Sequence, residues 1–294
     1  MTPDAALSSK PQTSGPRFAL ALGGGGARGL AHVHAIDTLN ELGIKPVGLA
    51  GSSIGSIMAA GMASGMTGQD IAAYARGVLS KKGEVASRMW KARTSGFGLR
   101  FTQFNIERIV DAFLPDAIPT RFEDLQIPLK VTAIDFYGNR LVVMEDGDLR
   151  SAIAASSAIP AVFSPVRRNG RVLIDGGFYN PVPFDLLQED ADIVIAVDVV
   201  GSPVPPEDPK AARKLPNSIE LMFGTSQLMM QSIISTKLER NPPQVLIRPP
   251  VSQYRVLDFL KADLILEETA SLKDNLKREI EKAVKLYEAR DASV

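Results

Sequence analysis

Apolar residues follow two different spacings in the first part of the chain. Continuous apolar runs occupy residues 18–22 and 47–50, as expected of buried strands. Between them, apolar residues recur every three or four positions over 30–42, and Gly43 follows as a helix stop. A small, apolar helix is expected over 54–60, directly after the second run. This strand–helix–strand succession favours a parallel sheet with a right-handed crossover.

The same patterns continue through the rest of the chain and predict an α/β fold. Further strands are expected at residues 128–135, 140–145, 165–168, 171–174, 191–200 and 244–247. Further helices are expected at residues 106–113, 149–158, 218–237 and 262–290. We expect residues 1–16 to be a disordered leader and residues 17–294 to form one domain, with 66–105 as a candidate flap and 201–294 as a C-terminal helical extension.

Composition narrows the classes of function. The 294 residues include 33 Lys plus Arg and 33 Asp plus Glu, so global charge gives no argument for a nucleic-acid partner. Cysteine is absent, which excludes disulfides, thiolate metal sites and a Cys nucleophile. Because His32 and His34 are the only histidines, a multi-histidine metal site is not expected, and the sequence predicts no metal and no cofactor.

The sequence also indicates where in the cell the protein is expected. Residues 1–16 lack the basic start and apolar core of a secretory signal, and no apolar stretch approaches the roughly 20 residues that span a bilayer. We expect a soluble, cytoplasmic protein, with peripheral membrane contact and homo-oligomer formation both left open. Residues 81–104 combine cations with aromatic rings, which predicts a mobile, membrane-facing flap. The alternative is a solvated basic loop whose aromatic rings pack on the core or on another subunit.

A Gly-x-Ser-x-Gly pattern stands between the second strand and the helix that follows it. Its serine, Ser53, is flanked two positions away on each side by Gly51 and Gly55. At such a sharp turn the serine is strained and exposed, and the glycines avoid a clash of Cβ atoms. The pattern predicts a nucleophile, although an ordinary serine in a glycine-flanked turn would give the same letters.

The first strand is followed by a glycine-rich loop, residues 23–29. Such a loop at a helix start can bind a dinucleotide, but the second strand ends without an acidic residue for the ribose. Its successive N–H groups can instead hold an oxyanion beside Ser53. Arg28 would add positive charge at the rim of this cradle, or would be an ordinary surface arginine. We expect the loop at a sheet edge, so that a side chain at Gly25 would lower turnover with little loss of stability.

A serine nucleophile needs a base within hydrogen-bond reach. No histidine follows position 34, and both His32 and His34 are expected to be structural. A carboxylate must then act directly, and Asp175 is the best candidate because it ends a strand and precedes two glycines. Its alternative role is an ordinary Asp-Gly turn. Three further polar residues are expected to be structural, namely Ser156, Ser157 and Asp198.

Four blocks together resemble the patatin-like phospholipase family, and in particular its bacterial members related to neuropathy target esterase. The blocks are Gly24–Gly29, Gly51–Gly55, Ala155–Pro160 and Asp175–Gly177, within a resemblance over roughly residues 17–200. The resemblance implies a three-layer α/β/α fold with a mostly parallel central sheet. It also implies a dyad of Ser53 as nucleophile and Asp175 as base. The oxyanion hole that it implies consists of Gly24, Gly25, Gly26, Ala27 and Arg28.

The activity implied by the resemblance is two-step acyl transfer. Ser53 would attack a fatty-acyl ester of a phospholipid or lysophospholipid, and water would then release the fatty acid from the acyl-enzyme. The partner expected is therefore a lipid ester substrate. Two other classes stay open, namely a nucleotide-binding protein that uses the glycine loop and a regulatory protein of low turnover on the same fold.

Overall fold

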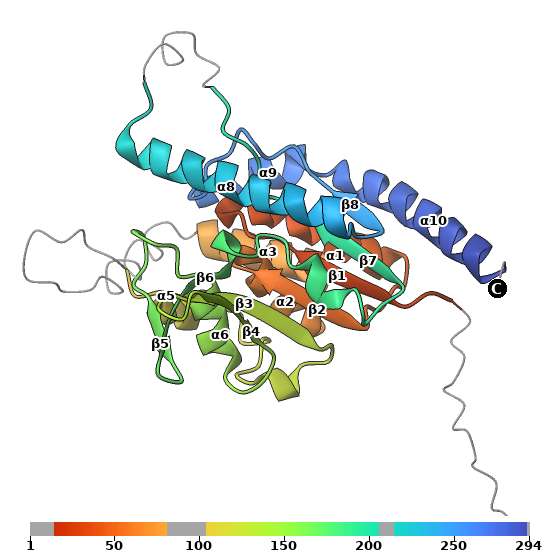
Figure 1. Cartoon of the computed structure of the whole chain (residues 1–294), viewed down its shortest axis with the longest axis horizontal. Coiled ribbons are helices and arrows are strands. Elements are labelled where there is room, and N and C mark those ends of the chain that lie inside the picture. Colours follow the sequence, from red (N-terminus) through yellow and green to blue (C-terminus); the bar gives the residue numbers. More distant parts are fainter. Residues whose placement is uncertain (1–14, 81–103, 206–214, 293–294) are drawn as a thin grey trace, which may run out of the picture.

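The structure is a computed structural model that describes residues 15–80, 104–205 and 215–292 (Figure 1). Its strands are β1 (Phe18–Leu22), β2 (Gly48–Ser52), β3 (Leu129–Asp135), β4 (Arg140–Met144), β5 (Val166–Arg168), β6 (Arg171–Asp175), β7 (Ile193–Val197) and β8 (Val245–Ile247). Its α-helices are α1 (His32–Glu41), α2 (Ile54–Ala63), α3 (Gly68–Ser80), α5 (Ile106–Phe113), α6 (Leu149–Ser156), α8 (Ser218–Arg240), α9 (Ala262–Glu268) and α10 (Leu272–Asp291). Short 3₁₀ turns lie at Gly26–Ala31, Phe122–Asp124, Gly176–Phe178, Phe184–Leu187 and Phe259–Lys261.

The described strands form one eight-stranded sheet. Hydrogen bonds connect them along the path β5-β6-β3-β2-β1-β7-β8, and β4 pairs with β3 off this path. The central pairs β3–β2, β2–β1, β1–β7 and β7–β8 are parallel, whereas the β4, β5 and β6 pairings are antiparallel. The predicted α/β fold with a mostly parallel sheet is confirmed, and β1 lies in the middle of the sheet rather than at its edge.

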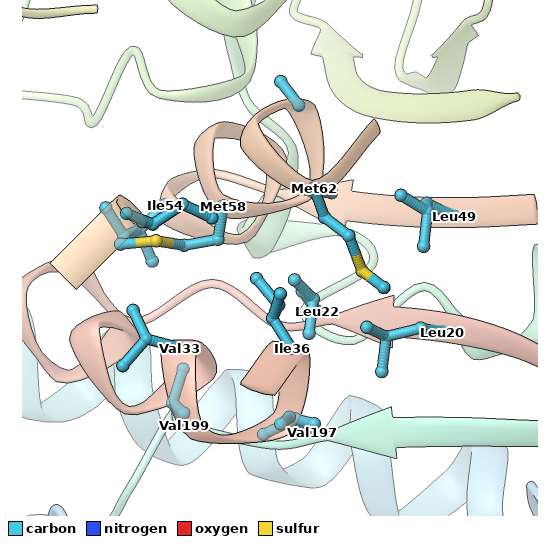
Figure 2. Close-up of a cluster of buried hydrophobic side chains, with 14 of the residues drawn as sticks. Leu20, Leu22, Val33, Ile36, Leu49, Ile54, Met58, Met62, Val197 and Val199 are labelled. Atoms are coloured by element: carbon cyan, nitrogen blue, oxygen red, sulfur yellow. The ribbon is translucent and has the colours of Figure 1, made fainter. Parts of the chain in front are cut away.

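Apolar side chains cover both faces of the sheet. On one face, Leu20 and Leu22 of β1 pack with Ile36 of α1 and with Met58 and Met62 of α2 (Figure 2). On the other face, small residues of β1, β2 and β7 pack against the 3₁₀ turn Phe184–Leu187 and against α8 through Ile234. Full burial of a large aliphatic side chain contributes about 1.5–3 kcal/mol, so this core holds the strand ends in place.

Two predicted elements differ in detail from the structure. The helix expected over 30–42 begins as the 3₁₀ turn Gly26–Ala31 and becomes α1 only at His32. The helix expected over 262–290 is divided into α9 and α10 around Thr269. The region expected to be a helical extension contributes more than helices, because β8 adds to the sheet and α9 and α10 pack into the main core.

Several predictions fall outside the described ranges. Most of the leader expected at residues 1–16 and of the flap expected at residues 81–104 lies there, so both stay predictions. None of the helices within residues 15–80, 104–205 and 215–292 combines the length and hydropathy that a membrane crossing needs.

Candidate active site

Strands β2 and β6 both pair with the same edge of β3, because β4 pairs with its other edge. β2 runs parallel to β3 and ends at Ser52, opposite Thr132, whereas β6 runs the other way and ends at Asp175, opposite Ala133. The two chain segments therefore point at each other, and Ser53, the residue after β2, meets Asp175.

Ser53 adopts a backbone conformation that few side chains tolerate. Its φ is 54° and its ψ is −128°, which costs on the order of 1–3 kcal/mol for a residue other than glycine. A Cβ on Gly51 would lie 2.5 Å from Ser56 Cα, and one on Gly55 would lie 2.0 Å from the Leu22 carbonyl oxygen. A Cβ atom is thus excluded at both positions, by the first turn of α2 at Gly51 and by the end of β1 at Gly55.

Ser53 and Asp175 are directly hydrogen bonded. Ser53 Oγ donates to Asp175 Oδ2 at 2.7 Å, and the Gly177 N–H donates to Asp175 Oδ1 at 2.8 Å. Asp175 is only 3% exposed, and this burial raises the pKa of its carboxyl to about 7, although both hydrogen bonds act to lower it. A carboxyl with a pKa near neutrality can take up and release a proton at physiological pH.

The N–H groups of the glycine loop do not all face the site. The Gly24 N–H donates to the Pro181 carbonyl at 2.9 Å, and the Ala27 N–H donates to the Val256 carbonyl at 2.8 Å. The N–H groups of Gly25 and Gly26 have no acceptor in the described part of the chain, and both residues are buried and line the pocket around Ser53. Of the residues predicted for the cradle, these two therefore have backbone donors free for an anion.

Arg28 is not a surface residue. It is 2% exposed, and its Nε donates to the Gly25 carbonyl at 3.0 Å, so the side chain holds the backbone of the glycine loop in place. Burial lowers the pKa of Arg28 to about 10, and the negative charge of Asp198 acts to raise it. Arg28 also lines the pocket, so its charge lies in the pocket wall rather than at an exposed rim. Asp198 itself is buried in an ion pair with Arg248 at 2.9 Å.

The position of the loop corrects the expectation for Gly25. Since β1 is central, the loop that follows it is enclosed, and a Cβ on Gly25 would lie 2.5 Å from the Val199 carbonyl oxygen. We expect Gly25→Val to destabilise the fold by roughly 1–3 kcal/mol as well as to lower turnover, because backbone must move to admit the side chain. Thermal unfolding measures this effect.

Gly77→Val is the matched control for the Gly25 variant, because a Cβ at Gly77 on α3 meets no atom of residues 15–80, 104–205 and 215–292 within 4 Å. The control should unfold at or above the wild-type temperature, since valine suits a helix better than glycine. An unchanged melting temperature in Gly25→Val would contradict the enclosed position of the loop.

The pocket has an apolar wall that the sequence did not predict. Ser53 and Asp175 open onto side chains from several elements, namely Ile159, Phe178, Phe223, Ser226, Gln227, Met230 and Val256. Four of these come from α8, where the spacing 223, 226, 227 and 230 places them on one helix face. That spacing identifies a shared face, but no local signal shows that the face is turned toward Ser53.

Neither histidine lines the pocket. His32 is fully buried beside the glycine loop, where its Nε2 lies 2.8 Å from the Gly23 carbonyl oxygen, and burial lowers its pKa to about 4. His34 Nε2 lies 2.8 Å from the Leu266 carbonyl oxygen. Both imidazoles thus hold backbone groups, in agreement with the structural roles expected for them.

Comparisons with known proteins agree with this architecture. The sequence model of patatin-like phospholipases matches residues 20–187. An uncharacterised NTE family protein of Mycobacterium tuberculosis is 37% identical over 195 residues, which are 66% of this chain and 52% of that protein. Patatin-like phospholipase domain-containing protein 7 of Mus musculus is 28% identical over 283 residues, which cover 86% of this chain and 20% of that protein.

Among solved structures, VipD from Legionella pneumophila aligns with 90% of this chain and 67% of its own, at a TM-score of 0.51 and 14% identity, which shows a likeness of fold alone. The chain spans about half the length of the mycobacterial relatives that it matches. The family match covers more than half of the chain and includes the glycine loop, the Ser53 turn and Asp175. The chain therefore belongs to the patatin-like phospholipase family.

Proposed function

We propose that this protein is a serine acyl hydrolase that cleaves fatty-acyl esters of phospholipids or lysophospholipids. The observation that carries the proposal is the 2.7 Å hydrogen bond from Ser53 Oγ to Asp175 Oδ2, in a pocket with an apolar wall. A nucleophile, its base and a place for an acyl chain are thereby combined in one site.

In the first step, Ser53 Oγ attacks the ester carbonyl while its proton passes to Asp175. The same proton then goes to the leaving alcohol oxygen as the ester C–O bond breaks, which leaves an acyl-enzyme and an ionised carboxylate. In the second step, water gives a proton to Asp175 and attacks the acyl-enzyme, and Ser53 recovers its proton as the fatty acid departs. One carboxyl with a pKa of about 7 serves both transfers.

The oxyanion of each tetrahedral intermediate would be held by the N–H groups of Gly25 and Gly26. Both amides lie in the pocket wall and have no other acceptor among the described residues, so they need not give up a hydrogen bond when the charge forms. The N–H of Ser53 is not available for this purpose, since it already donates to Ser156 Oγ at 2.8 Å. The buried charge of Arg28 in the same wall adds to the stabilisation.

The substrate class follows from the apolar side of the pocket. Phe178, Phe223 and Met230 offer ring and thioether surface beside Ser53, which suits an acyl chain better than a charged ligand. The family name and the names of its mouse relatives point the same way. Peripheral contact with a lipid surface and a single domain over residues 17–294 are parts of the same proposal.

The nucleotide-binding alternative receives less support from this geometry. Two of the amides that a phosphate cradle would use, those of Gly24 and Ala27, are engaged by carbonyl groups, and the facing wall is largely apolar. The regulatory alternative, with the same fold and little turnover, predicts neither covalent labelling nor ester hydrolysis. The experiment below therefore distinguishes it from the proposed hydrolase.

We expect the wild-type protein to be labelled covalently by a fluorophosphonate and to release fatty acid from lysophospholipid. Both rates should rise with pH and level off above about pH 7, because a protonated Asp175 cannot accept the proton of Ser53. The kcat/KM for a soluble short-chain ester, measured from about pH 5 to about pH 9, reports this ionisation in the free enzyme. A profile that is flat over this range would contradict Asp175 as the base, and a protein that neither labels nor hydrolyses at any pH would favour the regulatory alternative.

A further inference from the structure

Both backbone polar groups of Ser53 are held by the side chains of other serines. The Ser53 N–H donates to Ser156 Oγ at 2.8 Å, and the Ser53 carbonyl oxygen accepts from Ser56 Oγ at 2.6 Å. Ser156 is the last residue of α6 and Ser56 lies in the first turn of α2, so the two contacts come from different helices. Both serines are fully buried, and neither lines the pocket.

These contacts act where the chain is strained. At a φ of 54° and a ψ of −128°, the Ser53 peptide groups leave the regular path of both the strand before it and the helix after it. A strained conformation persists only where its surroundings over-determine it. Here one hydroxyl fixes the peptide group that enters Ser53 and the other fixes the peptide group that leaves it.

We propose that Ser156 and Ser56 are positioning residues that hold the backbone of Ser53 so that its hydroxyl is aligned with Asp175 for attack. The inference rests on the proposed hydrolase function and adds to it a role for the Ala155–Pro160 block, in which the sequence predicted only a structural role for Ser156. The two contacts are unequal. The Ser53 carbonyl also accepts from the Ser56 N–H at 2.9 Å, whereas Ser156 Oγ is the acceptor that the structure gives to the Ser53 N–H.

The inequality predicts a graded result. Ser156→Ala should lower kcat for a soluble ester and the rate of fluorophosphonate labelling by roughly 10-fold to 100-fold, as small displacements of a reacting group do. Ser56→Ala should lower both by less, because the backbone donor remains. KM should change little in either variant, since neither side chain lines the pocket.

The pH profile provides a readout that a merely structural role would not move. The hydrogen bond from Ser53 acts to lower the pKa of Asp175, so a loosened Ser53 should move the midpoint of the profile to higher pH. The exchange rate of the Ser53 amide hydrogen should rise in Ser156→Ala, and this measurement does not depend on activity. It therefore separates failure of this inference from failure of the proposed hydrolase function, which would appear as an unreactive wild-type protein.

Ser157→Ala is the matched control, because Ser157 is the next residue, is also buried, and has an Oγ without a hydrogen-bond partner among the described residues. For Ser56 the control is Ser64→Ala, because Ser64 caps the other end of α2 and its Oγ also donates to a backbone carbonyl, that of Ala60 at 2.7 Å. Both controls should keep wild-type kcat and pH midpoint.

If Ser156→Ala does not fold, Ser156→Cys retains a weaker acceptor and should give an intermediate loss. Equal effects in Ser156→Ala and Ser157→Ala, or wild-type kcat and midpoint in a folded Ser156 variant, would overturn the proposal.

Discussion

Ser53→Ala is expected to abolish fluorophosphonate labelling and to lower ester hydrolysis by on the order of 10⁴-fold or more. The substitution removes the atom that would form the acyl-enzyme, so no covalent route remains. The fold should be retained, because the methyl group of alanine needs no partner and Gly51 and Gly55 still allow the turn. Labelling is measured on a gel, hydrolysis by release of fatty acid, and folding by circular dichroism.

Ser52→Ala is the matched control for this variant. Ser52 is the preceding residue, is fully buried, and has an Oγ with no hydrogen-bond partner in the part of the chain that the structure describes, so the same loss of a hydroxyl should leave both activities intact. Hydrolysis at the wild-type rate by a folded Ser53→Ala protein would show that the nucleophile lies elsewhere.

Asp175→Asn should lower turnover by on the order of 10²-fold or more, because the amide accepts a hydrogen bond but cannot take the proton of Ser53. Asp135→Asn provides the comparison. Asp135 also ends a strand and is buried, but its partners are Gly138, Arg140 and Arg171, and it does not line the pocket. Equal losses in the two variants would assign the effect to folding rather than to proton transfer.

The same Asp175 substitution should stabilise the protein above neutral pH. The folded-state pKa of Asp175 is raised from 3.8 to about 7, so the folded protein favours the protonated carboxyl. The stability that this preference contributes is fully present below the unfolded pKa and is lost as pH rises through about 7. Asparagine stays neutral, and a shift of this size corresponds at most to about 4 kcal/mol. As pH increases from about 4 to about 8, the melting temperature of the variant should therefore rise relative to that of the wild type. A variant that is less stable than wild type at about pH 8 would contradict the destabilising effect expected of a buried, ionised Asp175.

Local sequence signals were sufficient for the turns of the site. Gly51 and Gly55 are required by atoms within a few residues of them and by the end of β1. Outside the site, Asn169 and Gly170 form the two-residue turn between β5 and β6, and both have the positive φ values typical of such an Asn-Gly turn. The α/β fold predicted from the hydrophobic patterns and the family resemblance carried by the four blocks are both confirmed.

Local sequence signals could not predict the features that depend on contacts between residues far apart in the sequence. The loop after β1 is enclosed because β7, which begins at Ile193, pairs with β1, and no pattern near Gly25 contains that information. The burial of Arg28 has the same origin, since it depends on the chain around Asp198 and Gly201. The contact of Ser156 with Ser53 and the position of the α8 face at the pocket likewise depend on pairings across more than a hundred residues.

Helix α8 lies outside residues 20–187, the part of the chain that the family match covers, yet it supplies Phe223, Ser226, Gln227 and Met230 to the pocket. Gln227 and Gln231 fix its rotation through hydrogen bonds to the carbonyls of Val200 and Gly201. Under the proposed function, part of the surface that would contact the acyl chain therefore lies in a stretch of sequence separate from Ser53 and Asp175. We therefore expect a relative with the same motif residues but different side chains at the positions of Phe223 and Met230 to prefer a different acyl chain.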